Sequence, residues 1–254
     1  MQFSIKRDVL LKSLNFVQGV VEKKNTLPIL SNVLIDVQEN KIIIIATDLD
    51  IIFYDEISDV KIQKKGSTTT SASVLYDILR KISGNSEIKF NLKDEKKLSL
   101  SADSSDFNLL CLPTDNFPTF DDNFDKQMIE LNNEQLLSLL NKSKISISND
   151  DTRHYLNGIF LHITESNNKT FLTGVSTDSH RLSSSSLEVK NDVKFSSIIL
   201  PRKTVFQLCS LLTEIKIPVN IQISDTKIKF IIGNMKLISK VIDGKFPDYR
   251  KDRE

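Results

Sequence analysis

The feature that most constrains this chain is an internal repeat. Near the start, residues 3–14 (FSIKRDVLLKSL) have the pattern of a short alternating strand followed by an amphipathic helix. About 125 residues later, residues 128–140 (MIELNNEQLLSLL) repeat this pattern, with Asn132 or Asn133 suited to cap the helix. The repeat predicts two copies of one structural unit.

Further landmarks recur in the same order in both halves. Two strands are expected after the first helix of each half, over residues 34–37 and 42–48 and over residues 159–163 and 170–178. Each pair ends in Thr-Asp, at Thr47-Asp48 and Thr177-Asp178. A second helix is expected over residues 73–82 and 202–212. Three more strands follow it in each half, over 87–92, 98–100 and 107–110 and over 219–223, 228–232 and 237–241.

These landmarks predict an α+β fold made of tandem repeats, in which antiparallel sheets carry two helices per domain. Antiparallel pairing is expected because the connections between the strands are of hairpin length. Each half ends in Phe-Pro, at residues 117–118 and 246–247, and the aspartate-rich segment 115–126 has the composition of a linker. We therefore expect domains over residues 1–124 and 125–254.

Composition excludes several classes of protein. A chain of 254 residues that is 39% hydrophobic and 26% charged is typical of a folded protein with two domains. No apolar run approaches the ~20 residues of a membrane-spanning helix, and the first residues do not have the pattern of a secretory leader. We expect a cytoplasmic protein.

The charge balance argues against a protein that is basic over its whole surface. Although the net charge is only +1, cations are concentrated in the expected helices and acidic residues in the loops and the linker. No zinc finger, aromatic stacking signature or basic stripe is present. Any contact with nucleic acid would therefore be made to phosphates, without reading the sequence.

An enzyme is the alternative reading. Asp48, Asp50, Asp178 and His180 follow expected strands, where carboxylates and imidazoles of hydrolases are often placed, so a metal-dependent hydrolase is conceivable. Thr-Asp at a strand end is more often a turn in which the carboxylate accepts backbone N–H bonds. No HxxxH, CxxC or phosphate-binding glycine loop occurs, and Cys111 and Cys209 lie in apolar runs typical of buried thiols. We expect no metal and no cofactor.

Seven tracts, in order, resemble the beta sliding clamp family of bacterial DNA polymerase III. They are Thr26–Leu30 (TLPIL), Thr47–Asp50 (TDLD), Phe117–Asp122 (FPTFDD), Arg153–Gly158 (RHYLNG), Thr177–Leu182 (TDSHRL), Pro201–Lys203 (PRK) and Val241–Tyr249 (VIDGKFPDY). The resemblance covers the whole chain and depends on the order and spacing of all seven tracts.

The resemblance implies a non-catalytic processivity factor. Members of the family have three clamp domains per subunit, and two subunits form a ring that encircles duplex DNA without regard to its sequence. They dock the polymerase III catalytic subunit, the clamp loader, other polymerases and repair factors through short linear motifs. The expected third repeat is not in this sequence, so we expect a truncated form that is monomeric, whereas a full-length chain would be a homodimer.

The family's functional positions can be placed on this sequence. For the peptide-binding cleft they are Leu156, Thr177, His180, Arg181, Leu182 and Pro247. For DNA contact they are Lys24, Arg80, Arg153, Tyr155, Arg202 and Lys203, and for the subunit interface, on an edge strand, Phe107 and Leu109. The chain departs from the family pattern at Ser73, Asp150, Ser179, Lys251 and Asp252. Ser179 replaces a usual glycine, which restricts φ in that loop.

Overall fold

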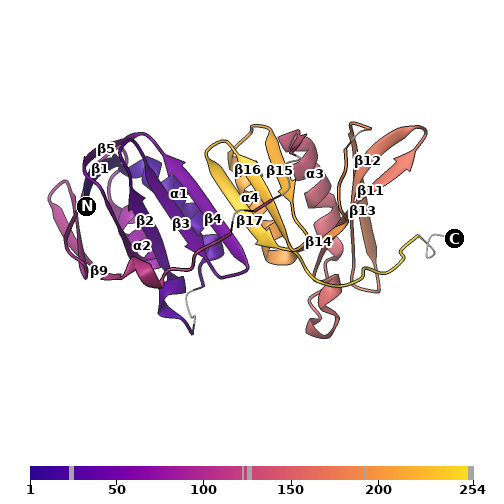
Figure 1. The fold of residues 1–254 in the computed structure, drawn as a ribbon, viewed down its shortest axis with the longest axis horizontal. Helices are drawn as coiled ribbons and strands as arrows, with labels where there is room; N and C mark the ends of the chain where they lie inside the picture. Colours follow the sequence, from indigo (N-terminus) through magenta and orange to yellow (C-terminus); the bar gives the residue numbers. More distant parts are fainter. Residues whose placement is uncertain (23–25, 122, 125–127, 192, 251–254) are drawn as a thin grey trace. The chain divides into compact units, whose positions relative to one another are not determined.

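The structure, a computed structural model, describes residues 1–22, 26–121, 123–124, 128–191 and 193–250. The chain divides into two compact units (Figure 1). Unit 1 comprises Met1–Asp122 and Asn234–Leu237, and unit 2 comprises Asn123–Gly233 and Ile238–Glu254. Among the described residues, no helix is both long enough and apolar enough to cross a membrane.

Unit 1 is an antiparallel sheet with two helices. Its strands are β1 (Gln2–Lys6), β2 (Asn32–Val37), β3 (Ile42–Thr47), β4 (Ile51–Ile57), β5 (Val60–Lys64), β6 (Gly66–Ser71), β7 (Glu87–Asp94), β8 (Lys97–Ala102) and β9 (Ser105–Leu112). They follow one another across the sheet in the order β4-β3-β2-β6-β9-β8-β7-β1-β5. The helices are α1 (Arg7–Val20) and α2 (Ala72–Lys81), and short 3₁₀ turns occur at η1 (Pro28–Ser31) and η2 (Thr114–Asn116).

The helices of unit 1 form because their apolar residues recur at helical spacing. In α1, Leu10, Leu14 and Val17 are fully buried, four and three residues apart, so they lie on one face. That face packs on β3 and β4, where the ring of Phe16 lies 5.8 Å from the ring of Phe53. The helix α2 begins at a cap, since the Ser71 hydroxyl accepts a bond from the N–H of Val74.

Unit 2 repeats this plan. Its strands are β10 (Ile129–Leu131), β11 (Gly158–Ser166), β12 (Lys169–Thr177), β13 (Leu182–Val189), β14 (Ile198–Pro201), β15 (Val219–Ile223), β16 (Lys227–Ile232) and β17 (Met235–Lys240). Its helices are α3 (Asn133–Ser143) and α4 (Arg202–Glu214), with 3₁₀ segments η3 (Lys144–Ser146) and η4 (Asp151–Leu156). The strand orders are β13-β12-β11-β14 and β10-β15-β16-β17, and β10 with β15, β11 with β12 and β14, β12 with β13, and β15 with β16 pair antiparallel.

The two units have matching topologies. In both, a strand leads into a helix, a hairpin-connected sheet follows, and a second helix precedes three further strands. In unit 1, β6 pairs with β9; at the equivalent place in unit 2, Ile199 of β14 forms an isolated bridge with Ile242 just after β17. The strand β5 is the one addition in unit 1. The predicted α+β fold with antiparallel sheets and two helices per unit is confirmed, as is the cap at Asn132, which accepts from Gln135 N–H.

More strands lie between the helices than the sequence patterns predict. In the described residues β2 to β6 lie there in unit 1 and β11 to β14 in unit 2, so β4, β5, β6, β13 and β14 were missed. The strands β6 (GSTTTS) and β13 (LSSSSLEV) lack an apolar alternation. They are strands because their neighbours pair with them along their length, from Asn32↔Ser71 to Val37↔Gly66 and from Thr170↔Val189 to Thr177↔Leu182.

Candidate functional site

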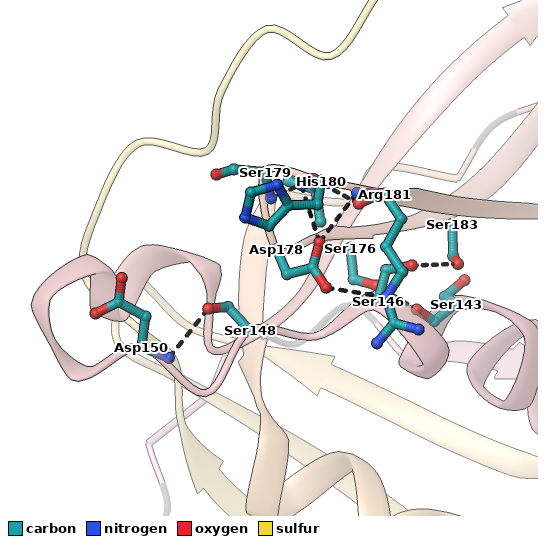
Figure 2. A network of polar contacts seen from close by, with 11 residues as sticks. Ser143, Ser146, Ser148, Asp150, Ser176, Asp178, Ser179, His180, Arg181 and Ser183 are labelled. Atoms are coloured by element: carbon teal, nitrogen blue, oxygen red, sulfur yellow. Dashed lines mark hydrogen bonds and ion pairs between the residues drawn. The ribbon is translucent and has the colours of Figure 1, made fainter.

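The residues of the predicted cleft centre on a hydrogen-bonded turn at the end of β12. The Thr177 hydroxyl donates to the carbonyl of Arg181 (2.8 Å) and accepts from the N–H of Ser179 (3.1 Å). One carboxylate oxygen of Asp178 accepts from the N–H groups of His180 and Arg181, both at 3.0 Å, and the other accepts from the Arg181 guanidinium at 2.9 Å (Figure 2). Both side chains are therefore used to hold the backbone of the turn.

The same turn occurs in unit 1. Thr47 donates to the carbonyl of Ile51 and accepts from Leu49 N–H, while the Asp48 carboxylate accepts from the N–H groups of Asp50 and Ile51. The middle residue has positive φ in both turns, +80° at Leu49 and +76° at Ser179. Ser179 thus adopts the strained backbone that the usual glycine would allow at lower cost.

These bonds decide the role of the Thr-Asp pairs. The backbone N–H of His180, and after it the Arg181 guanidinium, lower the pKa of Asp178 to about 2. A general base would need a pKa closer to the working pH and an oxygen directed at a substrate. The Thr-Asp pairs are therefore turn-forming devices, as the more common reading predicted, and the geometry gives no support to a hydrolase.

A loop that includes η4 lies beside this turn. The Asp150 carboxylate accepts from Thr152 N–H (2.9 Å) and from the Arg153 guanidinium (2.9 Å), and the N–H of Asp150 donates to Ser148 (Figure 2). Another nitrogen of the Arg153 guanidinium donates to the Ser179 hydroxyl at 2.6 Å. Arg153 therefore links the loop to the turn, so that Asp150, a departure from the family pattern, has a structural role.

An apolar cluster packs against the η4 loop, which contributes Leu156 to it. Leu156, Val175, Ile199, Phe246 and Tyr249 are buried together. Phe246 is stacked on Phe160 with centroids 5.0 Å apart and planes 6° apart, and the Tyr249 hydroxyl is 2.9 Å from Nε2 of the buried His162. The segment 242–250 thus packs against β11 and β12.

Gly244 lets this segment approach the η4 loop closely. Its φ is +158°, and a Cβ added there would lie 2.9 Å from the Cβ of Tyr155. The neighbouring carbonyl of Asp243 lies 3.1 Å from Nε2 of His154. A side chain at position 244 would push the segment away from the loop.

The predicted cleft residues differ in their burial and in the segment that holds them. Thr177, His180, Arg181 and Leu182 lie together in the turn, and the last three are exposed, Leu182 by 38%. Leu156 is buried in the cluster, and the exposed Pro247 follows the buried Phe246. Lys251 and Asp252 lie outside the described residues. Sequence reasoning missed Val175, Phe246 and Tyr249 as parts of this site, although the Phe-Pro landmark pointed to one of them.

The predicted DNA-contact residues also differ in their exposure and in their side-chain partners. Arg80, near the end of α2, and Arg202, at the start of α4, are exposed, and Lys203 is half-buried. Arg153 already pairs with Asp150, and Tyr155 packs against the apolar cluster. Lys24 lies outside the described residues. Ser73 lies in the first turn of α2, half-buried, within 3.3 Å of the Ser71 hydroxyl.

The predicted interface residues lie on β9. Phe107 and Leu109 pair with Leu100 and Leu98 of β8, while β6 pairs with Cys111 and Leu112 and its Thr70 hydroxyl donates to the Leu110 carbonyl. Residues 105–109 of β9 therefore pair on one side within the described sheet. Leu109 is only 4% exposed, whereas Leu110, which points to the other face, is 85% exposed. Leu110 was not among the predicted interface residues, although alternation along a strand places it opposite the buried Leu109.

The remaining candidates for chemistry are metal-ligating side chains and the two cysteines. Across the described chain, no three His, Cys, Asp or Glu side chains are grouped so that they could hold a metal ion. Cys111 and Cys209 are buried thiols that form no disulfide, as predicted, and burial raises the pKa of both.

Comparison with known proteins gives a consistent result. The family described as "DNA polymerase III beta subunit, N-terminal domain" matches residues 1–121, and "DNA polymerase III beta subunit, central domain" matches residues 130–248. The beta sliding clamp of Caulobacter vibrioides is 36% identical over 253 residues, which are 99% of this chain and 68% of the relative. That of Escherichia coli K12 is 33% identical over 251 residues, 67% of its length.

Solved structures agree with these relatives. The crystal structure of the sliding clamp of Caulobacter crescentus superposes with a TM-score of 0.94 at 36% identity, covering 100% of this chain and 69% of that one. A sliding clamp from Bartonella birtlesii bound to griselimycin gives a TM-score of 0.93 at 39% identity, covering 99% of this chain and 67% of that one.

Proposed function

We propose how this chain works from one premise: the chain belongs to the DNA polymerase III beta subunit family, the beta sliding clamps. It is accordingly a non-catalytic accessory subunit of DNA replication, a processivity factor that binds DNA and the polymerase. Its domains are residues 1–124 and 125–254, each a clamp domain, and it acts in the bacterial cytoplasm, where the chromosome is copied.

DNA contact in this proposal is weak and independent of sequence. The exposed cations Arg80 and Arg202, with Lys203 and Lys24, would meet phosphates, and a clamp retains DNA by encircling it. Tight phosphate contacts would hinder sliding. Arg153 and Tyr155 contribute by holding the η4 loop, since their side chains already have partners within unit 2.

Peptide docking uses the surface above the apolar cluster of unit 2. The observation that carries this proposal is the hydrogen-bonded turn Thr177–Leu182, whose carboxylate and hydroxyl are spent on holding the backbone. A turn held in this way presents His180, Arg181 and Leu182 with little ordering cost, while Leu156 and Phe246 form the buried support and Pro247 lies at the margin. The occupants are linear motifs of the polymerase III catalytic subunit, the clamp loader, other polymerases and repair factors.

Subunit pairing uses the free side of β9. An unpaired strand segment with an exposed leucine favours addition of a strand from another subunit. Phe107 and Leu109 support that edge, and Leu110 supplies exposed apolar surface. A homodimer of clamp subunits would form through this edge.

Peptide titration of the whole 254-residue chain tests the docking site. A peptide of the type Gln-Leu-x-Leu-Phe should bind with a Kd of about 10⁻⁵–10⁻⁴ M, because apolar burial is partly offset by ordering costs. Leu182→Ser should weaken binding about tenfold in isothermal calorimetry, since the turn loses its apolar side chain.

The matched control is Ile217→Ser. Ile217 is 40% exposed in the same unit, close to the exposure of Leu182, but it lies after α4 and away from the turn in sequence. Its substitution should leave the Kd unchanged. Equal affinity of Leu182→Ser and the unaltered chain, or equal weakening by both variants, would rule out the turn as the docking site.

A further inference from the structure

An exposed aromatic side chain on α4 is held between two cations. Phe206 is 45% exposed. The Lys144 ammonium lies 5.3 Å from its ring centroid and the Arg202 guanidinium carbon 5.4 Å from it. Both distances are within the range of cation–π attraction. The ring therefore orders two positive charges that come from different elements.

The local structure explains how the three residues meet. Arg202 and Phe206 are four residues apart on α4, so they lie on one helix face. Lys144 opens η3 immediately after α3, and α3 packs against α4. The Lys144 ammonium also donates to the side-chain oxygen of Asn141 at 2.6 Å, which leaves further N–H donors for a ligand.

The two charges are available to an anion. Among the described residues, no carboxylate forms an ion pair with Lys144 or Arg202, in contrast to Lys169, which pairs with Glu188 at 2.9 Å. Both charges lie within 5.4 Å of one ring centroid, so they are separated by no more than about twice that distance, roughly one Debye length at 0.1 M salt. Each charge is therefore free to meet a phosphate of the DNA backbone.

The position of Arg202 and Lys203 strengthens this reading. They are the first two residues of a 13-residue helix, whose N-terminus carries a partial positive charge. Cations there oppose the helix dipole, and the first turn holds no acidic residue that would offset them. The arrangement costs stability in the isolated chain and becomes favourable when an anion binds.

We propose that Phe206 is a positioning residue that aligns Lys144 and Arg202 as a two-cation clamp on the phosphate backbone of duplex DNA. The inference rests on the proposed DNA contact and extends it to Lys144 and Phe206. The ring holds the charges before DNA arrives, so less side-chain entropy is lost on binding. The clamp recognises phosphate and no base, which is compatible with sliding.

Fluorescence anisotropy of a labelled duplex, titrated with the whole chain in about 20–100 mM salt, tests the clamp. Lys144→Gln and Arg202→Gln should each weaken binding and reduce the slope of log Kobs against log salt by about 0.9. Phe206→Leu should weaken binding about two- to fivefold with the slope retained, because both charges remain but are no longer aligned. Phe206→Trp should restore affinity, since indole is the strongest cation–π partner.

Lys169→Gln is the charge-matched control and should leave binding unchanged. If Phe206→Leu binds as tightly as the unaltered chain, or if Trp fails to restore binding that Leu has lost, the positioning role is wrong while the DNA contact stands. If the unaltered chain shows no salt-dependent duplex binding, the proposed DNA contact fails, and the clamp fails with it.

Discussion

At the scale of single residues, polar side chains in this protein are used mainly to fix its backbone. Arg7 shows this: its guanidinium donates to the carbonyl of Leu79 at 2.8 Å, so this cation ties α1 to α2. The Asp178 carboxylate and the Arg153 guanidinium act likewise around the turn of unit 2. Charge content alone could not separate such residues from Arg80 and Arg202, because the separation depends on which neighbours the fold supplies.

One buried carboxylate makes stability depend on pH. Asp55 on β4 is 4% exposed, and burial raises its pKa to about 6, opposed by the nearby Ser13 hydroxyl and Lys12 ammonium and reinforced by Glu56. The folded chain therefore holds this proton more tightly than the unfolded chain. Between about pH 4 and pH 6 the free energy of unfolding should fall as pH rises, by roughly 3 kcal/mol for this group, and then level off.

Asp55→Asn tests that account. The amide cannot ionise, so at pH 7.5 the free energy of unfolding of the variant should exceed that of the parent by up to roughly 3 kcal/mol. At pH 4 the two free energies should differ little. Urea unfolding at both pH values measures this. Asp77→Asn, on the exposed side of α2, is the control and should change neither value. A stabilisation by Asp55→Asn that is equal at both pH values would contradict a buried, ionised carboxylate.

At the scale of elements, α3 is held against β12 at very close range. A Cβ added to Gly174 would lie 2.8 Å from the Leu139 side chain and 3.0 Å from the Ser143 hydroxyl. That hydroxyl donates to the carbonyl of Gly174 at 2.9 Å, and Ser176 donates to the carbonyl of Ser143 (Figure 2). Hydrogen bonds to both neighbours of position 175 leave the helix little room to move.

Gly174→Ala should therefore destabilise unit 2 by about 1–3 kcal/mol through overpacking. The loss should appear in hydrogen exchange of α3 and β12 amides, with α1 and α2 unaffected. Ser185→Ala, directly opposite Gly174 on β13, is the control and should cost much less. Unchanged exchange in α3 would show that the helix can shift to accept a methyl group.

The elements also show what sequence patterns could predict. The helices and several strands with apolar runs, such as β3 (IIIIAT) and β16 (KIKFII), were predicted correctly. The strands β6 and β13 were missed because their serines and threonines carry no hydrophobic period. Bonds such as Thr69 hydroxyl to the Leu112 carbonyl (2.8 Å) satisfy their buried polar groups, and these partners are distant in sequence. The turn at Thr177 was predictable as a motif, but its link to Arg153 was not.

At the scale of the whole molecule, one unit is used twice, and each copy carries a helix pair with exposed cations. Such contact with DNA should be weak, with a Kd on the order of 10⁻⁴ M or above at physiological salt, and should not depend on base sequence. Retention on DNA then comes from ring closure in the family's full assembly and not from affinity.

The most direct test of this account is an NMR titration of the isotopically labelled chain with two duplexes of unrelated sequence. Both duplexes should shift the same amide signals, in α2 near Arg80 and in α4 and η3 near Arg202 and Lys144, and the shifts should disappear as salt is raised. Shifts that differ between the duplexes, or that centre on the Asp48 and Asp178 turns and leave the helices unchanged, would contradict it.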